Sequence, residues 1–172
     1  MEFFEVIKKR RSIRAYKVGK VIPDEILFRI LESARLAPSA SNLQPWKFII
    51  IRDSRLKTDI AKLCKGRMWI ADASAVIAGV ATRPDYRMGS GQEAFRIDIA
   101  TAFAHMTLTA NNESLGCCWI GSFSADECKK LLGIPDQYPL VGFLTVGYPD
   151  EIPGPKERKS MEEIVCYDRW AE

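Results

Sequence analysis

A long, almost wholly apolar segment limits the folds open to this 172-residue chain more than any other feature of its sequence. The pattern predicts a helix over about residues 93–114, and the central run IDIATAFAHMTLTA is apolar on nearly every face. A helix of this kind needs cover on all sides, so it lies either at the centre of the molecule or in a subunit interface. Gly116 is placed to cap its end.

The rest of the chain mixes helices and strands in one domain, 1–172, because no linker-like segment divides it. Helices are predicted at 3–10, 23–37, 54–64 and 124–133, and strands at 47–52, 74–81, 117–120 and 139–148. The helix at 124–133 starts with a capping-box pattern, Ser124 to Glu127, and ends on Gly133. Residues 82–92 are dense in Gly, Pro and Ser and are predicted to form a loop.

Residues 149–172 form an extended tail that is rich in proline and charge but keeps one apolar patch, MEEIVCYDRW. This patch holds Ile164, Val165, Tyr167 and Trp170, which a disordered tail would not usually retain. These side chains cannot form a core alone. The tail is therefore expected either to cover the sheet of its own subunit or to wrap around a partner subunit.

Charge and hydropathy exclude several classes of function. The net charge of +3 is too small for a general polyanion binder, so the basic residues act locally and no nucleic-acid partner is expected. No apolar stretch approaches the roughly 20 residues that span a bilayer. Glu2 and Glu5 interrupt the apolar N-terminal run, so no signal peptide and no membrane association are expected.

The cysteines and the one histidine point to neither disulfides nor metal. The five cysteines are Cys64, Cys117, Cys118, Cys128 and Cys166. Because their number is odd and no C-x-x-C pattern occurs, we interpret them as reduced, mostly buried thiols of a cytoplasmic protein. His105 lies in the apolar helix without partners for a metal, so a packed histidine is expected and no metal site is predicted.

Two polar segments have residue types that suit a phosphorylated, planar ligand. RRSIR, residues 10–14, combines arginine forks, which match phosphate oxygens, with a neutral serine donor. Its alternative interpretation is a solvated basic helix end, in which the positive charges favour the helix dipole. In PSASNLQPW, residues 38–46, Asn42 and Gln44 each offer a donor and an acceptor. The alternative there is a turn whose side chains bond their own backbone.

Two further segments are weaker signals when taken alone. In CCWIGSF, residues 117–123, a glycine lets the backbone approach a ligand, although a strand ending in a tight turn would look the same. In GPKERKSMEE, residues 154–163, Lys156 and Arg158 lie two positions apart, which is also typical of a solvated charge run.

In this order and at these positions, the four segments resemble the nitroreductase family of FMN-dependent oxidoreductases. The matching pieces also include the helix that leads to LGCCWIGSF, the runs LLGIP and VGYP, and the closing KERKSMEEIVCYDRW. The resemblance implies an α+β, three-layer fold with a mixed, largely antiparallel sheet flanked by helices. It also implies a homodimer with an exchanged C-terminal tail and two FMN sites at the interface.

The resemblance assigns a role to each segment. Arg10 and Ser12 would hold the FMN phosphate, with Arg11 as a third contact and the tail pair Lys156 and Arg158 assisting. Arg14 would reach the N1 and C2-carbonyl edge of the flavin, where negative charge gathers on reduction. Residues of 38–44 would contact the same FMN from the other subunit, and backbone N–H groups after the 117–120 strand would lie near N5. The complete cofactor-binding set is Arg10, Arg11, Ser12, Arg14, Pro38, Ser39, Ala40, Asn42, Gln44, Ile120, Gly121, Ser122, Lys156 and Arg158.

Two departures from the family pattern affect this assignment. Longer members carry an Asn and a Lys before the mid-chain strand, whereas this chain reads KGRMWIADAS, with Gly66 and Trp69 nearest those positions. Lys65 or Arg67 would have to substitute. The loop 82–92 is short, so the site is either open or closed by the partner chain.

The expected activity is two-step hydride transfer, in which NADH or NADPH reduces FMN and a small acceptor such as a nitroaromatic or a quinone reoxidises it. No protein acid, base or nucleophile is required, because the flavin supplies the chemistry. Alternatives within the family are reductive dehalogenation, flavin fragmentation and oxidation of peptide heterocycles. A flavin-binding protein with little turnover is a further alternative, and so is nucleic-acid binding by the basic patch.

Overall fold

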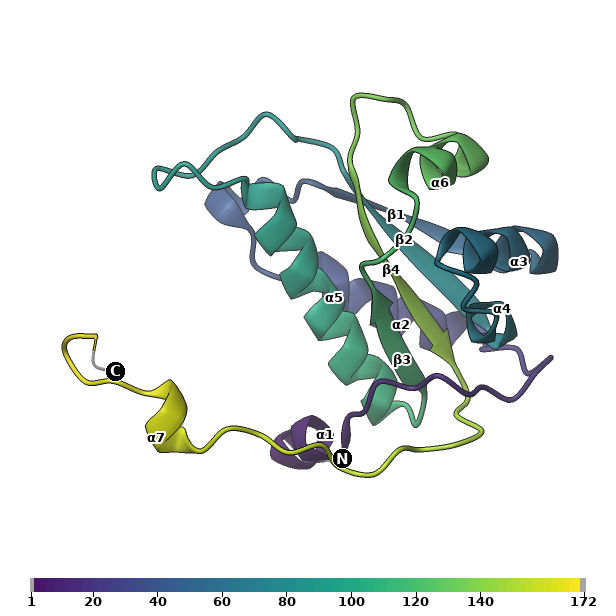
Figure 1. Ribbon diagram of the computed structural model, residues 1–172, viewed down its shortest axis with the longest axis horizontal. Coiled ribbons are helices and arrows are strands. Elements are labelled where there is room, and N and C mark those ends of the chain that lie inside the picture. The colour runs from purple at the N-terminus through teal and green to yellow at the C-terminus, as the bar shows by residue number, and fades with distance from the viewer. Residues whose placement is uncertain (1, 171–172) are drawn as a thin grey trace.

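The computed structural model describes residues 2–170 and contains a sheet with helices on both faces (Figure 1). The helices are α1 (Phe3–Lys9), α2 (Asp24–Arg35), α3 (Ser54–Leu63), α4 (Trp69–Asp72), α5 (Ala94–Asn112), α6 (Ala125–Leu132) and α7 (Met161–Ile164). The strands are β1 (Trp46–Ile51), β2 (Ala75–Ala81), β3 (Gly116–Ile120) and β4 (Leu140–Gly147). A 3₁₀ turn, η1 (Ala40–Asn42), precedes β1.

Within residues 2–170 the sheet has four strands in the order β1-β2-β4-β3, and every neighbouring pair is antiparallel. Strand β2 is buried along its whole length, which fits its uncharged sequence AVIAGVA. The parallel component is an isolated bridge between Ser12 and Cys117 at the β3 edge. The predicted largely antiparallel sheet is therefore confirmed.

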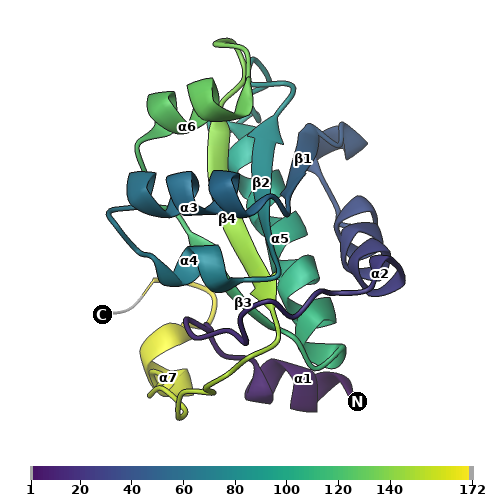
Figure 2. The same cartoon turned by 90° about the vertical axis from the view of Figure 1, so that its right-hand side faces the viewer.

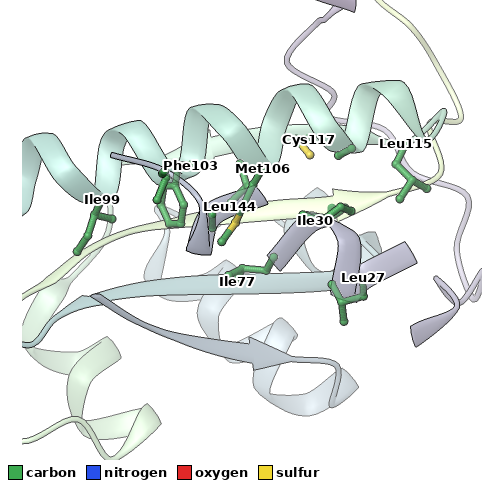
Figure 3. Packing of buried hydrophobic residues seen from close by; sticks show 14 of the residues in the cluster. Leu27, Ile30, Ile77, Ile99, Phe103, Met106, Leu115, Cys117 and Leu144 are labelled. Atoms are coloured by element: carbon green, nitrogen blue, oxygen red, sulfur yellow. The ribbon is translucent and has the colours of Figure 1, made fainter. Parts of the chain in front are cut away.

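The three predicted layers are also confirmed. Helices α2 and α5 lie on one side of the sheet, and α3, α4 and α6 lie on the other (Figure 2). Figure 3 shows Phe103 and Met106 of α5 facing Ile77 and Leu144 of the sheet, with Ile30 of α2 beside them. Helix α5 thus packs against the sheet, but Ile97 and Ala104 stay exposed in the single chain, so the helix is not covered on all sides as its sequence predicts.

Two predicted helix caps are wrong. Gly116 does not cap α5. The left-handed residue is Ser114, with φ of 60°, and Gly116 begins β3, where a side chain would collide with Ile13. Ser124 does precede α6, but its side chain makes no capping hydrogen bond. The predicted C-terminal Gly133 is confirmed, with φ of 65°.

The tail does not cover the sheet of its own chain. Residues 154–170 are exposed, and they run past α1 and away from the body of the molecule (Figure 1). A true capping box, between Ser160 and Glu163, starts the short helix α7 within this segment. The end of the predicted tail, 171–172, lies outside the described residues. Among the helices of residues 2–170, none has both the length and the apolar character needed to cross a membrane.

Candidate functional site

The arginine-serine segment lies extended along the edge strand β3. Helix α1 ends just before it, and the Ile13 amide donates to the Cys117 carbonyl at 2.9 Å. The Ile13 side chain is only 3% exposed, whereas Arg10 and Ser12 are half-buried and Arg14 is exposed. Because side chains alternate along extended backbone, burying Ile13 turns these three polar residues outward. The basic segment is thus held in place along the edge of the sheet and is not simply the frayed end of a helix.

A buried hydroxyl pair anchors this segment. The Tyr16 hydroxyl donates to the Ile13 carbonyl at 3.0 Å and lies 2.7 Å from the Thr145 hydroxyl of β4. The Thr145 Oγ1 in turn bonds the backbone of Cys118, both N–H and C=O at 3.2 Å. Burial raises the pKa of Tyr16 far above its ordinary value, so the phenol stays protonated and its hydrogen bonds persist at neutral pH.

Arg11 differs from its neighbours in what it contacts. Its guanidinium donates to the carbonyls of Lys8, at 2.6 Å, and Arg10, at 2.9 Å. These bonds satisfy carbonyls at the end of α1. The helix-end interpretation therefore describes Arg11, while Arg10 and Arg14 make no such contact with the end of α1 within the hydrogen bonds of residues 2–170.

Two hollows open along this edge, and the exposed indole of Trp119 contributes to both. One, of about 350 Å³, is lined by Arg14, Arg67, Trp69, Cys118, Trp119, Ile120, Gly121 and Ser122. The other, of about 490 Å³, is lined by Ile7, Arg10, Ser12, Ala104, Thr107, Leu108, Cys117 and Trp119. The structure thus gathers six predicted residues on one strip: Arg10, Ser12, Arg14, Ile120, Gly121 and Ser122.

The second predicted segment, 38–44, is a tight and strained turn. Three of its residues have left-handed backbone: Ser41 with φ of 51°, Asn42 with 53° and Gln44 with 48°. Such conformations persist only where surrounding contacts hold them. The Gln44 amide nitrogen Nε2 donates to Asn42 Oδ1 at 3.3 Å, and the Gln44 backbone N–H donates to Ser39 Oγ at 2.9 Å. The local turn interpretation is therefore correct for these bonds.

This turn is fastened to the start of α5. The backbone N–H of Ala40, two residues after Pro38, donates to the Asp98 Oδ1 at 3.0 Å. Asp98 is buried, and its other oxygen has no hydrogen-bond partner within residues 2–170. The hydroxyls of Ser41 and Tyr86 lie 2.9 Å apart, which joins the turn to the loop 82–92.

The 38–44 turn and helix α1, which leads into the arginine segment, are fastened to opposite ends of α5 in one chain. Asp98 holds the 38–44 turn, whereas Asn111 donates to the Val6 carbonyl at the arginine-bearing end, at 2.9 Å. Thirteen residues of helix separate these two anchors, which corresponds to about 20 Å. Lys156 and Arg158 belong to the exposed tail.

The burial of four cysteines and the packing of His105 agree with the sequence prediction. Four cysteines are buried, and burial raises the pKa of the thiols, to about 11 for Cys64 and about 12 for Cys128. The Nδ1 of His105 contacts the Ser33 carbonyl at 3.1 Å, as a packed histidine would. Within residues 2–170 no cluster of potential metal ligands occurs.

Sequence reasoning missed several residues that build the site. Tyr16 and Thr145 act together only because β4 passes beneath the arginine segment, which no local pattern reveals. Asp98 was detectable, since a carboxylate inside an almost wholly apolar helix needs a partner. Trp119 belongs to the segment CCWIGSF, but its exposure follows from its place on the edge strand β3.

The layers and the strand order define an α+β protein with a cationic edge beside β3, and its fold matches that of a solved nitroreductase. The model of the nitroreductase family matches residues 7–89 and 80–148. The chain belongs to the nitroreductase family, and the predicted enzyme class, a nitroreductase-like oxidoreductase, is confirmed.

Individual relatives agree with this. A protein of Archaeoglobus fulgidus, named provisionally as an NADH dehydrogenase/NAD(P)H nitroreductase, is 32% identical, with 87% of each chain covered. The iodotyrosine deiodinase of Thermotoga neapolitana is 28% identical over 97% of this chain and 98% of its own. The structure of an FMN-dependent nitroreductase from Clostridium difficile superposes with a TM-score of 0.81 at 25% identity, covering 97% of this chain and 99% of that one.

Proposed function

We propose that this protein is an FMN-dependent oxidoreductase that passes hydride from NADH or NADPH to a small acceptor such as a nitroaromatic or a quinone. The observation that carries the proposal is the strip along β3, where Arg10, Ser12 and Arg14 lie beside Gly121 and Ser122. The names of the Archaeoglobus and Clostridium relatives support the donor and the cofactor. When bound, FMN supplies the ring that takes up and releases two electrons.

The residues of this strip suit such a ligand. Arg10 and Ser12 provide charged and neutral donors for a phosphate, and Lys156 and Arg158 of the tail would add charge. A side chain at Gly121 would meet no atom within 4 Å, so this glycine leaves open space over the end of β3. Backbone N–H groups there would then be accessible to a planar ring.

The proposal includes a homodimer in which each FMN lies between two chains. In one chain, about 20 Å of α5 separates Asp98, which anchors the 38–44 turn, from Asn111, which anchors α1. We therefore expect Pro38, Ser39, Ala40, Asn42 and Gln44 to come from the partner. Large apolar side chains remain uncovered on α1 and on the tail, among them Phe3, Phe4, Tyr167 and Trp170. Large apolar side chains exposed in this number are typical of interaction sites.

Reductive dehalogenation is the second candidate, because the Thermotoga deiodinase matches almost the whole chain. The two activities use the same cofactor and differ in the acceptor. Here the loop 82–92 is fastened to the 38–44 turn through Tyr86 and Ser41, and it would form one wall of the acceptor site. Parallel assays with a nitroaromatic, a quinone and a halotyrosine distinguish the two candidates.

The decisive test is a pair of spectra. The purified protein should show the absorbance of oxidised flavin, or gain it when FMN is supplied, and anaerobic NADH or NADPH should bleach it. Titration should favour FMN over riboflavin, because Arg10 and Ser12 would bind the phosphate. Equal affinity for FMN and riboflavin would contradict the phosphate assignment, and absence of bleaching by both nucleotides would indicate a passive flavin carrier.

A further inference from the structure

The hollow beside Arg14 contains a second arginine to which the proposed function gives no role. Arg67 lies between α3 and α4, where Lys65 and Gly66 have left-handed backbone, with φ of 59° and 67°. This reversal returns the chain toward the end of β3. The Arg67 Nη1 then donates to the Ser122 carbonyl at 3.5 Å, at the long limit of a hydrogen bond.

Arg67 and its neighbour Lys65 differ in their surroundings. Arg67 is half-buried and lines the 350 Å³ hollow together with Arg14, Gly121 and Ser122. Lys65 is exposed and does not line that hollow. Of the two residues that could replace the missing family Asn and Lys, the structure therefore favours Arg67.

The charges of Arg67 and Arg14 both act on the Cys118 thiol. Burial raises the pKa of the Cys118 thiol, while Arg14 and, more weakly, Arg67 oppose this rise. Arg14, Arg67 and Cys118 all line the same 350 Å³ hollow, so the two cations lie beside one binding space. The guanidinium of Arg67 carries several N–H donors, so its one bond to the Ser122 carbonyl leaves others for a ligand.

We propose that Arg67 is a second cationic contact to the pyrimidine edge of the bound flavin, acting with Arg14 to favour the reduced, negatively charged form. This inference rests on the proposed function. Arg67 would replace the Asn and Lys that longer family members use, and it would contact the ring and leave the phosphate to Arg10 and Ser12. Trp69, which occupies one of the replaced positions, then serves as a wall of the hollow.

The test compares wild-type protein with Arg67→Gln, Arg67→Lys and the matched control Lys65→Gln. Dissociation constants are measured for FMN and for riboflavin, and the reduction potential is measured on FMN-saturated protein. Arg67→Gln should weaken the binding of FMN and of riboflavin by a similar factor, roughly tenfold, because a hydrogen bond to a charged group is lost. A tenfold loss of preference for the reduced form would lower the potential by about 30 mV.

Arg67→Lys keeps the charge and should recover most of the potential, and Lys65→Gln should match the wild type in every measurement. If the wild type binds FMN, and Arg67→Gln has the same dissociation constants and reduction potential as the wild type, this inference is overturned and the proposed function stands. If the wild type binds neither FMN nor riboflavin, the proposed function falls and the inference falls with it.

Discussion

At the residue scale, the outward charges depend on one apolar side chain. Ile13 is buried against β3, and this fixes the direction of Arg10, Ser12 and Arg14. Gly116 makes the packing possible, because any side chain there would overlap Ile13. The polar side chains of RRSIR therefore lie on one side of the segment only because Ile13 packs against β3.

Replacing Arg14 by alanine should lower the reduction potential of the bound flavin and slow its reduction by NAD(P)H. Reduced flavin gathers negative charge at the edge that Arg14 would face, and a hydrogen bond to a charged group contributes about 1.5–3 kcal/mol. The potential of FMN-saturated Arg14→Ala, with Arg14→Lys as the charge-preserving control, measures this. An unchanged potential would place Arg14 at the phosphate or at the surface.

Each cysteine should be replaceable singly by alanine with flavin reduction retained. Burial raises the pKa of Cys64, Cys117, Cys118 and Cys128, so these thiols stay protonated and are poor nucleophiles at neutral pH. Cys118 is the most sensitive position, since it lines the hollow with Arg14. A folded, flavin-loaded Cys118→Ala that no longer accepts electrons from NAD(P)H would point to a redox-active thiol.

At the element scale, the 38–44 turn should depend on α5 for its shape. Asp98→Ala removes the acceptor of the Ala40 N–H, and leaving such a group unsatisfied costs about 1–3 kcal/mol. We expect a lower melting temperature and weaker FMN binding. Asp98→Asn keeps an acceptor oxygen and should retain more of both. Equal behaviour of the two variants would show that this hydrogen bond does not position the turn.

The tail is the element with the least support from its own chain. A protein ending at Ser160 would lose Met161, Ile164, Tyr167 and Trp170, all exposed in the single chain, while keeping Lys156 and Arg158. We expect it to lose dimerisation and flavin binding together, by sedimentation and absorbance. The control is full-length Lys156→Gln, which should stay dimeric and bind FMN more weakly. A truncated protein that remains a flavin-loaded dimer would refute a structural role for the tail.

Elements with a sustained pattern were predictable, and those that depend on distant contacts were not. The stripe of α2, the uncharged β2 and the apolar α5 appear where their periodicity places them, within two residues at most ends. The one-turn helices α4 and α7 are too short to show a period. Ser124 resembled a cap because its sequence spacing fits, but its backbone N–H instead donates to Leu63 in a neighbouring element.

The candidate site was predictable in composition and not in arrangement. The resemblance supplied its residues, and the structure gathers six of them beside β3. No glycine in the 38–44 segment signals the left-handed conformations of Ser41, Asn42 and Gln44. Gly66 permits the chain reversal before Arg67, but Lys65 is also left-handed, and the letters KGRM do not place Arg67 beside Ser122.

At the scale of the whole molecule, one chain keeps the two proposed parts of the binding site apart. Helix α1 and the 38–44 turn are held by opposite ends of α5, and apolar side chains of α1 and the tail lack cover. A second copy would complete the site and bury that surface. An interface built in this way should exceed about 2,000 Å², a size typical of obligate dimers, which often have no stable folded monomer.

The central claim, that each FMN is shared between two chains, is tested most directly by the flavin content of a mixed dimer. One chain carries Arg10→Ala and Arg14→Ala, and the other carries Ser39→Trp. Each variant alone should form flavin-free homodimers. If the sites are shared, one site of the heterodimer combines the altered arginine segment with the altered 38–44 turn, and the other site combines the two unaltered parts. The account therefore predicts close to half of the wild-type flavin content. Almost no flavin in the heterodimer would show that each site lies within one chain and would contradict the account.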